Sequence, residues 1–380
     1  MSSPSSPTRS ETVIVVGAGI VGLACAWWLQ RRGHQVLLVD PAVGGAPEPE
    51  AGGRSGSRSA LGVLMADLFH RDRGRAWELR QRSLRLWHLW RTELGRRGHD
   101  VPHRAGVLVL AAEPAETERL ARLAAAKRDL GLPLRLWDRQ RLEPLLPSLP
   151  RPCLAGLHSP RDGQLDPGAA LAALAADGQA LGMAIRAQAA AALEPHRTGW
   201  RVALAGGGHE EAAWVVLAAG GASVTLLENL QGAGTTGGPL EPVLGQALEL
   251  ELAAPLPAAW PGTVVWRGIN LVPRPDLEGG RRLWLGATLE PGLGADPARL
   301  ADLRHLMGAA PDWLSGARVL QRWQGLRFRP VGRPAPLLEQ PAPGLLLAGG
   351  HYRNGVLLAP ASAAWVADRI EAGGDLPSQP

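Results

Sequence analysis

The 380-residue chain is poor in lysine, tyrosine and cysteine. Lys127 is its only lysine and Tyr352 its only tyrosine, so arginine supplies almost all of the positive charge. The two cysteines, Cys25 and Cys153, form no CxxC pair, which argues against a disulfide framework or a zinc site. Long runs of like charge are also missing and the net charge is only +5, so we expect no nucleic-acid partner. These absences suit a globular protein of a reducing compartment and predict a cytoplasmic location.

A membrane span is the next class to consider. Residues 12–29 are uncharged and have the length of a signal anchor, and Arg9 precedes them. Three glycines interrupt this run, however, and a second apolar segment ending in an acid follows, which a membrane anchor does not need. No other segment of the sequence is long and apolar enough, so we expect no transmembrane segment.

The best-defined pattern lies between Thr12 and Asp40. The β-branched run Val13–Val16 is typical of a buried strand, and so is Val36–Val39. Between them, a helical segment opens with a G-x-G-x-x-G turn formed by Gly17, Gly19 and Gly22. This order is typical of a dinucleotide-binding unit, whose glycines allow a tight turn, a close pyrophosphate and helix–strand packing. Asp40 is placed to accept hydrogen bonds from a ribose hydroxyl.

The glycine spacing alone is a weak signal, because residues 232–237 repeat it. No strand precedes this second copy, and no helical run or terminal acid follows it, so it is predicted to be a loop. The length of the chain indicates two domains rather than one core. Residues 1–10 are rich in serine and proline and are predicted to be a disordered tail.

The rest of the chain predicts further helices and strands. Helical spacing covers residues 73–93, 114–130, 168–181, 297–308 and 356–371. Strands are expected at residues 106–110, 183–188, 200–205, 211–217, 244–252, 263–272, 282–288 and 345–348, with an irregular linker at 144–152. The strands between residues 244 and 288 predict a mostly antiparallel sheet in a second domain. Helix 73–93 is basic and amphipathic; it could lie on a membrane surface, but packing between domains is the favoured interpretation.

The most specific string is G-H-Y-R-N-G-V-L-L-A-P-A, which runs from Gly350 to Ala361. Four shorter strings accompany it: P-V-L-G-Q at 242–246, L-V-P-R at 271–274, L-G-A-T at 285–288 and Q-G-L-R at 324–327. In their order and spacing, from residue 12 to about 371, they resemble the FAD-dependent D-amino-acid oxidase family, and within it the glycine oxidases of thiamine biosynthesis.

This resemblance implies an α/β fold. A Rossmann-like FAD-binding domain of the GR2 flavoprotein type would carry an inserted α+β substrate domain built on a mostly antiparallel sheet. The FAD-binding domain would comprise residues 11–72, 150–240 and 325–380, and the substrate domain residues 73–149 and 241–324. FAD would be bound without a covalent link, since no cysteine lies near the C-terminal string.

The resemblance also assigns cofactor contacts residue by residue. The ADP part of FAD would lie against Gly17, Gly19, Ile20, Val21, Gly22, Asp40 and Pro41. The ribityl chain and ring would follow Gly56, Ser57, Leu61, Gly62 and Val63. The backbone of Ala191, at the end of the strand that begins near Met183, would contact the adenosine. The isoalloxazine would be covered by His351, Tyr352, Arg353, Asn354, Gly355, Val356 and Leu357.

Two arginines are the implied substrate-binding residues. Arg327 would pair with the substrate carboxylate through two parallel hydrogen bonds, and Arg353 would lie close by. Either arginine could instead form an ion pair between domains. Asn270 stands where the glycine oxidases carry a tyrosine that touches the carboxylate. Its amide can still donate a hydrogen bond but leaves more room, which puts glycine as the preferred substrate in doubt. His351 is expected to hold the backbone rather than to carry a proton.

The implied reaction is oxidative deamination of glycine, sarcosine or a small D-amino acid, yielding an imino or 2-oxo acid, ammonia and hydrogen peroxide, with O2 as acceptor and a role in thiamine biosynthesis. Hydride transfer from Cα needs no protein base, which fits a sequence with no evident catalytic acid–base pair and no metal site. Three alternatives stay open: a dehydrogenase that passes electrons to a quinone or carrier, a tRNA-modifying oxidase of the same fold, and a flavin-binding module without turnover. A homo-oligomer is also left open.

Overall fold

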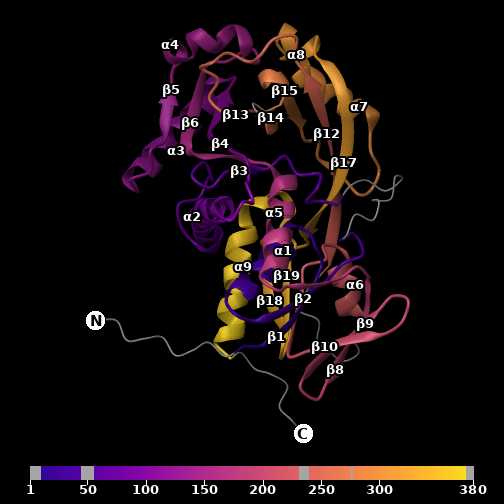
Figure 1. Cartoon of the computed structure of the whole chain (residues 1–380). Helices are drawn as coiled ribbons and strands as arrows, with labels where there is room; N and C mark the ends of the chain where they lie inside the picture. Colours follow the sequence, from indigo (N-terminus) through magenta and orange to yellow (C-terminus); the bar gives the residue numbers. More distant parts are fainter. Residues whose placement is uncertain (1–9, 44–54, 231–238, 275–276, 374–380) are drawn as a thin grey trace.

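The computed structural model describes residues 10–43, 55–230, 239–274 and 277–373, and these form two parts arranged one above the other (Figure 1). The lower part holds a six-stranded sheet and three long helices, α1 (Ile20–Arg31), α5 (Pro167–Ala180) and α9 (Gly355–Glu371). The upper part is built on a ten-stranded sheet, with α3 (Pro114–Asp129) and α7 (Pro297–His305) toward its outer sides.

The lower sheet is parallel except at one edge. Its strand order is β18-β19-β11-β1-β2-β7, and only β18 runs against its neighbour β19. The bounds are β1 Thr12–Val16, β2 Gln35–Val39, β7 Ala184–Arg186, β11 Trp214–Leu217, β18 Leu337–Ala342 and β19 Leu345–Gly349. Valines and leucines on both faces of the central strands are buried, because α1, α5 and α9 cover one face and a small three-stranded sheet with a short helix covers the other. The predicted Rossmann-like unit is thereby confirmed.

The upper sheet is antiparallel in all but one strand pair, β4 with β13. Its order is β16-β12-β15-β14-β13-β4-β6-β3, with β17 added on β12 and β5 on β6. The bounds are β3 Val63–Leu64, β4 His103–Ala111, β5 Arg135–Trp137, β6 Ala155–Leu165, β12 Leu240–Glu251, β13 Thr263–Trp266, β14 Ile269–Arg274, β15 Arg282–Gly286, β16 Glu290–Pro291 and β17 Arg318–Pro330. The mostly antiparallel sheet is therefore confirmed, and β6 and β17 belong to it. Where one domain passes into the other remains a proposal.

Two predicted single strands are in fact pairs of strands. Residues 211–217 divide into the end of β10 (His209–Ala212) and β11, because β10 pairs with β9 whereas β11 pairs with β1. Ala213, between them, donates its N–H to the hydroxyl of Thr12. Residues 263–272 form the hairpin β13–β14, whose two turn residues, Arg267 and Gly268, both have positive φ. Such a two-residue turn matches the twist of the strands. Because the residues on both sides of the turn are apolar, the sequence alone predicted one continuous strand.

The position expected for Ala191 was also wrong. The chain leaves the lower sheet after β7, because Gln188 donates its N–H back to the carbonyl of Arg186. Ala191 then lies in β8 (Ala190–His196), the outer strand of a separate three-stranded sheet with β9 (Gly199–Leu204) and β10. Residues 144–152, expected to be an irregular linker, begin with a 3-10 helix, Glu143–Ser148, that follows α4 (Arg139–Leu142). Leu145 and Leu149 are buried there, which explains the regular structure.

The predicted helices are confirmed to within a few residues. Asp166 caps α5 by accepting the N–H of Ala169, and Asp296 caps α7 by accepting that of Ala298. The two remaining short helices of the described residues are α6 (Ala222–Glu228) and α8 (Asp312–Ser315). On α3, the ammonium of the single lysine, Lys127, lies 3.5 Å from the ring centre of Trp77 and is buried. The second glycine-rich copy, residues 232–237, and most of the expected N-terminal tail lie outside the described residues.

Helix α2 (Arg75–Arg96) packs against α9, and hydrogen bonds join the two helices close to a proline inside α9. Pro360 lies inside α9 and has no N–H, so the carbonyl of Val356 lacks its helical donor. The indole N–H of Trp87 donates to that carbonyl at 2.8 Å, and the Ser83 hydroxyl accepts the N–H of Ala361 at 3.0 Å. Helix α2 therefore packs against α9, as the favoured interpretation of its sequence predicted.

Among the described residues, no helix meets the length and hydropathy of a membrane span.

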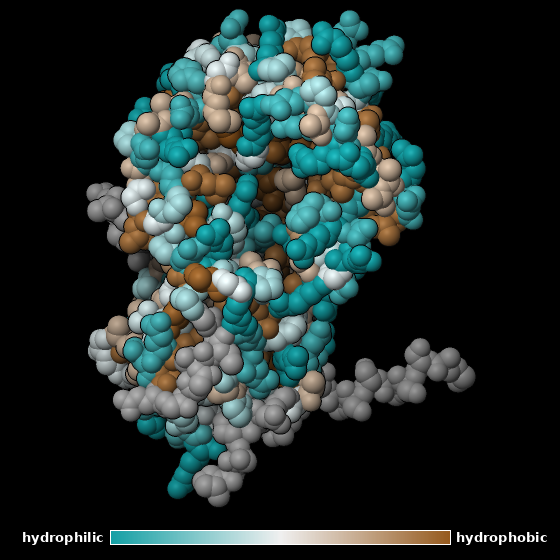
Figure 2. Space-filling view, turned by 180° about the vertical axis from the view of Figure 1, so that it is seen from behind, coloured by the Kyte–Doolittle hydropathy of each residue, from teal (hydrophilic) through white to brown (hydrophobic). Residues whose placement is uncertain are grey.

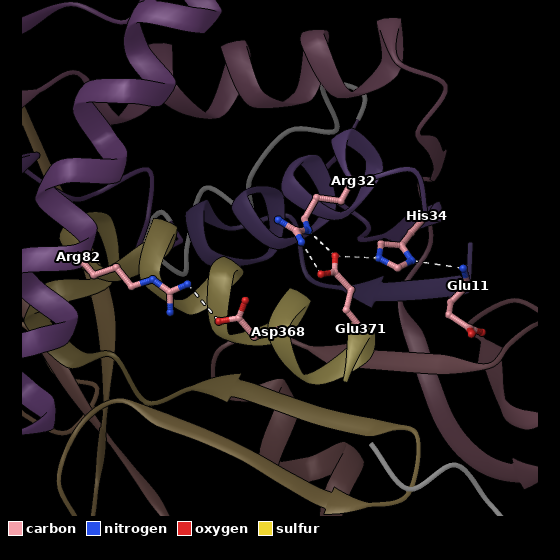
Figure 3. Close-up of polar contacts among 6 residues, drawn as sticks. All are labelled: Glu11, Arg32, His34, Arg82, Asp368 and Glu371. Atoms are coloured by element: carbon pink, nitrogen blue, oxygen red, sulfur yellow. Dashed lines mark hydrogen bonds and ion pairs between the residues drawn. The ribbon is translucent and has the colours of Figure 1, made fainter. Parts of the chain in front are cut away.

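Ion pairs hold the last turns of α9 (Figure 3). Arg82 of α2 bonds Asp368 at 3.0 Å, and Glu371 pairs with Arg32 and, at 3.5 Å, with His34. The other ring nitrogen of His34 accepts the N–H of Glu11. Exposed ion pairs are each worth only about 0–1 kcal/mol, so these contacts align α9 with its neighbours more than they stabilise it.

Candidate functional site

One cavity of about 890 Å³ extends along the junction of the two parts. Its walls come from the glycine turn after β1, the segment 55–63, the end of β11, β17, and the stretch from β19 into α9. Seen from behind, the surface has a recess in its upper half with hydrophobic side chains at its base (Figure 2). The volume is in the range of pockets that hold cofactors and their substrates.

The glycine turn is packed so tightly that side chains would not fit. Gly17 has a φ of +109°, and a Cβ there would lie 2.6 Å from the backbone of Ala218. A Cβ on Gly22 would lie 1.8 Å from the carbonyl oxygen of Gly17. Gly22 therefore packs helix α1 onto the turn, while Gly17, Gly19, Ile20 and Val21 line the cavity. The turn presents the N-terminus of α1, with its positive dipole end, to any phosphate in the cavity.

Asp40 lies beside this turn. One carboxylate oxygen accepts the N–H of Ala18 and the other that of Ala42, both at 2.7 Å. These bonds fix the carboxylate at the cavity wall, where an acid that binds a ribose hydroxyl should stand.

The segment 55–63 lies between the start of α1 and strand β17. The Ser57 hydroxyl accepts the N–H of Ile20 at 2.9 Å. A Cβ on Gly56 would meet the carbonyl oxygen of Leu326 at 2.6 Å, and one on Gly62, where φ is +76°, would meet that of Leu165 at 1.9 Å. The predicted residues Gly56, Ser57, Leu61, Gly62 and Val63 all line the cavity.

The C-terminal string forms the opposite wall. His351 is buried, and its Nε2 lies 2.8 Å from the hydroxyl of Ser362. Burial, together with the charge of Arg75, lowers the pKa of His351 to about 4, so the ring is neutral at pH 7. It therefore joins the loop to α9 and is a poor proton carrier. From His351 to Val356 every residue lines the cavity, and α9 starts there at Gly355.

Arg327 enters the cavity from β17. Its Nη1 donates to the carbonyl of Thr288 at 3.1 Å, and among the described residues no carboxylate contacts it. Burial, and then the nearby charge of Arg353, lowers the pKa of Arg327 to about 10. Gly245 on β12 supplies the space, since a Cβ there would lie 2.2–2.4 Å from the guanidinium. The guanidinium is thus partly buried, cationic at pH 7 and, among the described residues, not in contact with a carboxylate.

A polar network lies behind this arginine, and sequence reasoning had assigned it no role. The Gln246 N–H donates to the Thr288 hydroxyl at 2.7 Å, and the Gln246 amide donates to Glu290 at 2.9 Å. Glu290 also accepts the N–H of Asp296 at 2.6 Å. The strings P-V-L-G-Q and L-G-A-T therefore supply, through Gly245 and Thr288, the space and the acceptor for Arg327.

The other predicted residues are placed less uniformly. Asn270 lines the cavity, and its amide nitrogen donates to the carbonyl of Gly286 on β15 at 3.0 Å. Arg353 is exposed at the cavity wall. Four predicted cofactor contacts do not line the cavity: Gly22, Pro41, Ala191 and Leu357. In the described part of the chain, no group of three His, Cys, Asp or Glu side chains could hold a metal ion.

Comparison with known proteins agrees with this geometry. The family model DAO, described as FAD dependent oxidoreductase, matches residues 12–369. A glycine oxidase of Geobacillus kaustophilus is 28% identical over 379 residues, covering 96% of this chain and 94% of that protein. A Rhizobium etli protein named as a thiamine biosynthesis oxidoreductase is 28% identical over 367 residues, covering 94% and 96%. The crystal structure of glycine oxidase from Geobacillus kaustophilus superposes with a TM-score of 0.82 at 26% identity, covering 97% of this chain and 96% of that one.

Proposed function

Because the chain belongs to the DAO family of FAD-dependent oxidoreductases, we propose that it oxidises the Cα–N bond of an amino acid whose carboxylate binds Arg327. The observation that carries the proposal is the Arg327 guanidinium, partly buried in the cavity wall with no carboxylate contact among the described residues. A planar guanidinium binds a carboxylate through two parallel hydrogen bonds, which fixes the orientation of the acid as well as its position.

The residues that line the cavity fit FAD. At Gly17, Gly22 and Gly62 a Cβ would overlap backbone atoms, and the backbone at the start of α1 is left bare toward the cavity. Asp40 is held by two backbone N–H groups at the position of a ribose-binding acid. When bound, FAD would accept a hydride from the substrate Cα and deliver the two electrons to O2 as hydrogen peroxide.

The chain itself then has to bind and orient more than it has to move protons. Arg327 holds the carboxylate, and Thr288 and Gly245 hold Arg327. His351 is neutral and bonded to Ser362, and no pair of carboxylates faces the substrate end of the cavity among the described lining residues. The substrate amine would enter neutral, so that loss of the Cα hydrogen as hydride requires no protein base.

The products follow from the balance of the reaction. A primary amino acid, O2 and water give 2-oxo acid, ammonia and hydrogen peroxide, with the imino acid as the species that water hydrolyses; an N-alkyl amino acid such as sarcosine gives the alkylamine in place of ammonia. Glycine, sarcosine and small D-amino acids are the first substrates to test, because relatives over most of the chain are named glycine oxidases. A role in thiamine biosynthesis is proposed from the relative that carries this name.

The decisive experiment is anaerobic bleaching of the flavin. The purified holoenzyme is mixed without oxygen with glycine, sarcosine and the D- and L-forms of small amino acids, and the flavin absorbance is followed. Loss of the oxidised spectrum with at least one of them supports amino-acid oxidation, and an unchanged spectrum with all of them overturns it. Peroxide yield in air, compared with reduction of an artificial dye under nitrogen, then distinguishes an oxidase from a dehydrogenase.

A further inference from the structure

The cavity also has a lobe to whose residues the proposed reaction assigns no role. Its walls are α2, α3, β4 and the segment that follows β3. Met65, Val109 and Leu123 line it and are only partly buried, although they pack on a closed apolar core. An apolar surface left open toward a cavity is suited to an apolar stretch of a ligand.

The polar side chain of this lobe that is most buried is Arg80, which is only 8% exposed. Its guanidinium carbon lies 3.8 Å from the ring centre of Phe69, and its Nη1 donates to the carbonyl of Ala76 on its own helix at 2.9 Å. Neither partner is an anion. Burial, with the charge of Arg71, lowers the pKa of Arg80 to about 10, so the side chain remains cationic at pH 7.

The buried acids of the adjoining segment are engaged by other groups. Asp67 accepts a hydrogen bond from Gln81 at 2.9 Å and lies 3.4 Å from Arg161. Asp162 accepts three backbone N–H groups, those of Ala66, Asp67 and Leu68, at 2.7–2.9 Å. A buried guanidinium beside an aromatic ring, at the wall of a cavity and without a carboxylate among the described residues, is a site for an anion supplied from outside.

We propose that the substrate is an amino acid with a second carboxylate, which binds Arg80 across the lobe while the α-carboxylate binds Arg327. This inference rests on the proposed function and narrows its substrate class. The apolar wall formed by Met65, Val109 and Leu123 contacts the methylene groups between the two acids. The second acid stands either on the side chain or on the amine nitrogen, and the chemistry that Arg80 recognises is the same in both cases.

The test uses the holoenzyme and pairs of substrates that differ only in charge. Aspartate, glutamate and 2-aminoadipate are compared with their side-chain amides, as D- and L-forms, and N-carboxyalkyl glycines are compared with N-alkyl glycines. We expect kcat/KM to be at least about tenfold higher for one of these acids than for its neutral partner. If every neutral partner is used as well as its acid, the proposal is wrong.

Variants connect that preference to Arg80. In Arg80→Gln the ratio of kcat/KM between the acid and its amide should fall at least about tenfold, and Arg80→Lys should restore part of it. Arg122→Gln, at an exposed position of α3 with 73% of its side chain accessible, should leave the ratio as in the wild type. Because Arg80 is buried, Leu123→Glu provides a second route: a carboxylate in the lobe should lower the ratio without removing the arginine. A ratio unchanged in both Arg80→Gln and Leu123→Glu contradicts the assignment.

The outcome also separates the two proposals. If neutral amino acids bleach the flavin and the dicarboxylates have no advantage, only the second carboxylate is excluded. If no amino acid of any kind bleaches it, the proposed function itself fails. Binding of unreactive glutarate and butyrate, followed by the perturbation of the flavin spectrum, gives a readout without turnover: glutarate should bind at least tenfold more tightly.

Discussion

Two arginines of the cavity wall, the buried Arg80 and the partly buried Arg327, differ in the groups that hold them. Each has a pKa lowered to about 10, and each donates to one backbone carbonyl. Arg327 donates to the carbonyl of Thr288, which follows the end of β15. The nearby charge of Glu290 favours the charged form of its guanidinium. Arg80 bonds its own helix and lies over a ring. Arg327 is thus positioned by a residue far from it in the sequence, whereas Arg80 is held by its own helix and by the segment just before it.

The largest expected effect on catalysis follows from replacing Arg327. Arg327→Met should cost about 2–5 kcal/mol of substrate binding, because a desolvated carboxylate loses its partner. Measured as kcat/KM for the best substrate, the loss should greatly exceed that of Arg80→Met with a monocarboxylate. FAD content and thermal unfolding serve as controls. An unchanged Michaelis constant would remove Arg327 from the site.

A pH titration of stability tests the acid under the Arg80 lobe. Burial, and then the charge of Asp67, raises the pKa of Asp162 to about 7 from 3.8, against the opposing effect of three backbone N–H groups. Between these values the unfolded chain loses a proton that the folded chain keeps. The free energy of unfolding should therefore fall as pH rises from about 4 to 7, by as much as about 4 kcal/mol. Asp162→Asn should lack this slope; a variant with the wild-type slope would contradict the assignment.

Helix α2, which carries Arg80, donates a hydrogen bond to the carbonyl of α9 that Pro360 leaves without a helical donor. Trp87→Phe keeps the aromatic packing but leaves the Val356 carbonyl without a donor, which should cost about 1–3 kcal/mol in unfolding free energy. Denaturant unfolding measures this loss. Leu89→Ala, at a position of the same helix that is 64% exposed, is the matched control and should stay within about 0.5 kcal/mol of the wild type. An equal loss of unfolding free energy in the two variants would mean that the hydrogen bond from the Trp87 indole to the Val356 carbonyl does not stabilise the fold.

The smallest effect concerns the space around Arg327. In Gly245→Ala the new methyl group would displace the guanidinium, and we expect kcat/KM to fall roughly tenfold, about 1.4 kcal/mol, with little change in stability. Gly294→Ala is the control, since a Cβ there meets nothing within 4 Å and φ is not positive. A wild-type kcat/KM in the Gly245 variant would show that Arg327 has another productive position.

Local sequence patterns were sufficient to predict the part of the cavity wall that is proposed to bind the cofactor. The turn at Gly17 and the acid at Asp40 depend on one strand–helix–strand unit, so their relative position follows from spacing alone. The resemblance placed the string from Gly350 in the opposite wall, where it lies. Which of these residues contact the cofactor remains a prediction.

The Arg80 end could not be predicted in this way. Helix α2 carries several arginines, and its pattern indicated that they would lie away from the apolar side. Arg80 is nevertheless buried, because Phe69, in the segment just before α2, lies against its guanidinium. In the same way, the break at Ala213 depends on two different partners, β1 and β9, which the sequence of residues 211–217 does not encode.

The buried ammonium of Lys127 has a consequence for the chemistry of the surface. Since this chain has no other lysine, the described surface offers no ε-amine to acylating reagents. Burial also raises the pKa of Cys25 to about 12 and that of Cys153 to about 11, so neither thiol is a ready nucleophile or an easy target for oxidants. A protein proposed to release peroxide thus keeps its two thiols buried. One cysteine introduced on the described surface would be a unique handle for a dye, a tether or an electrode.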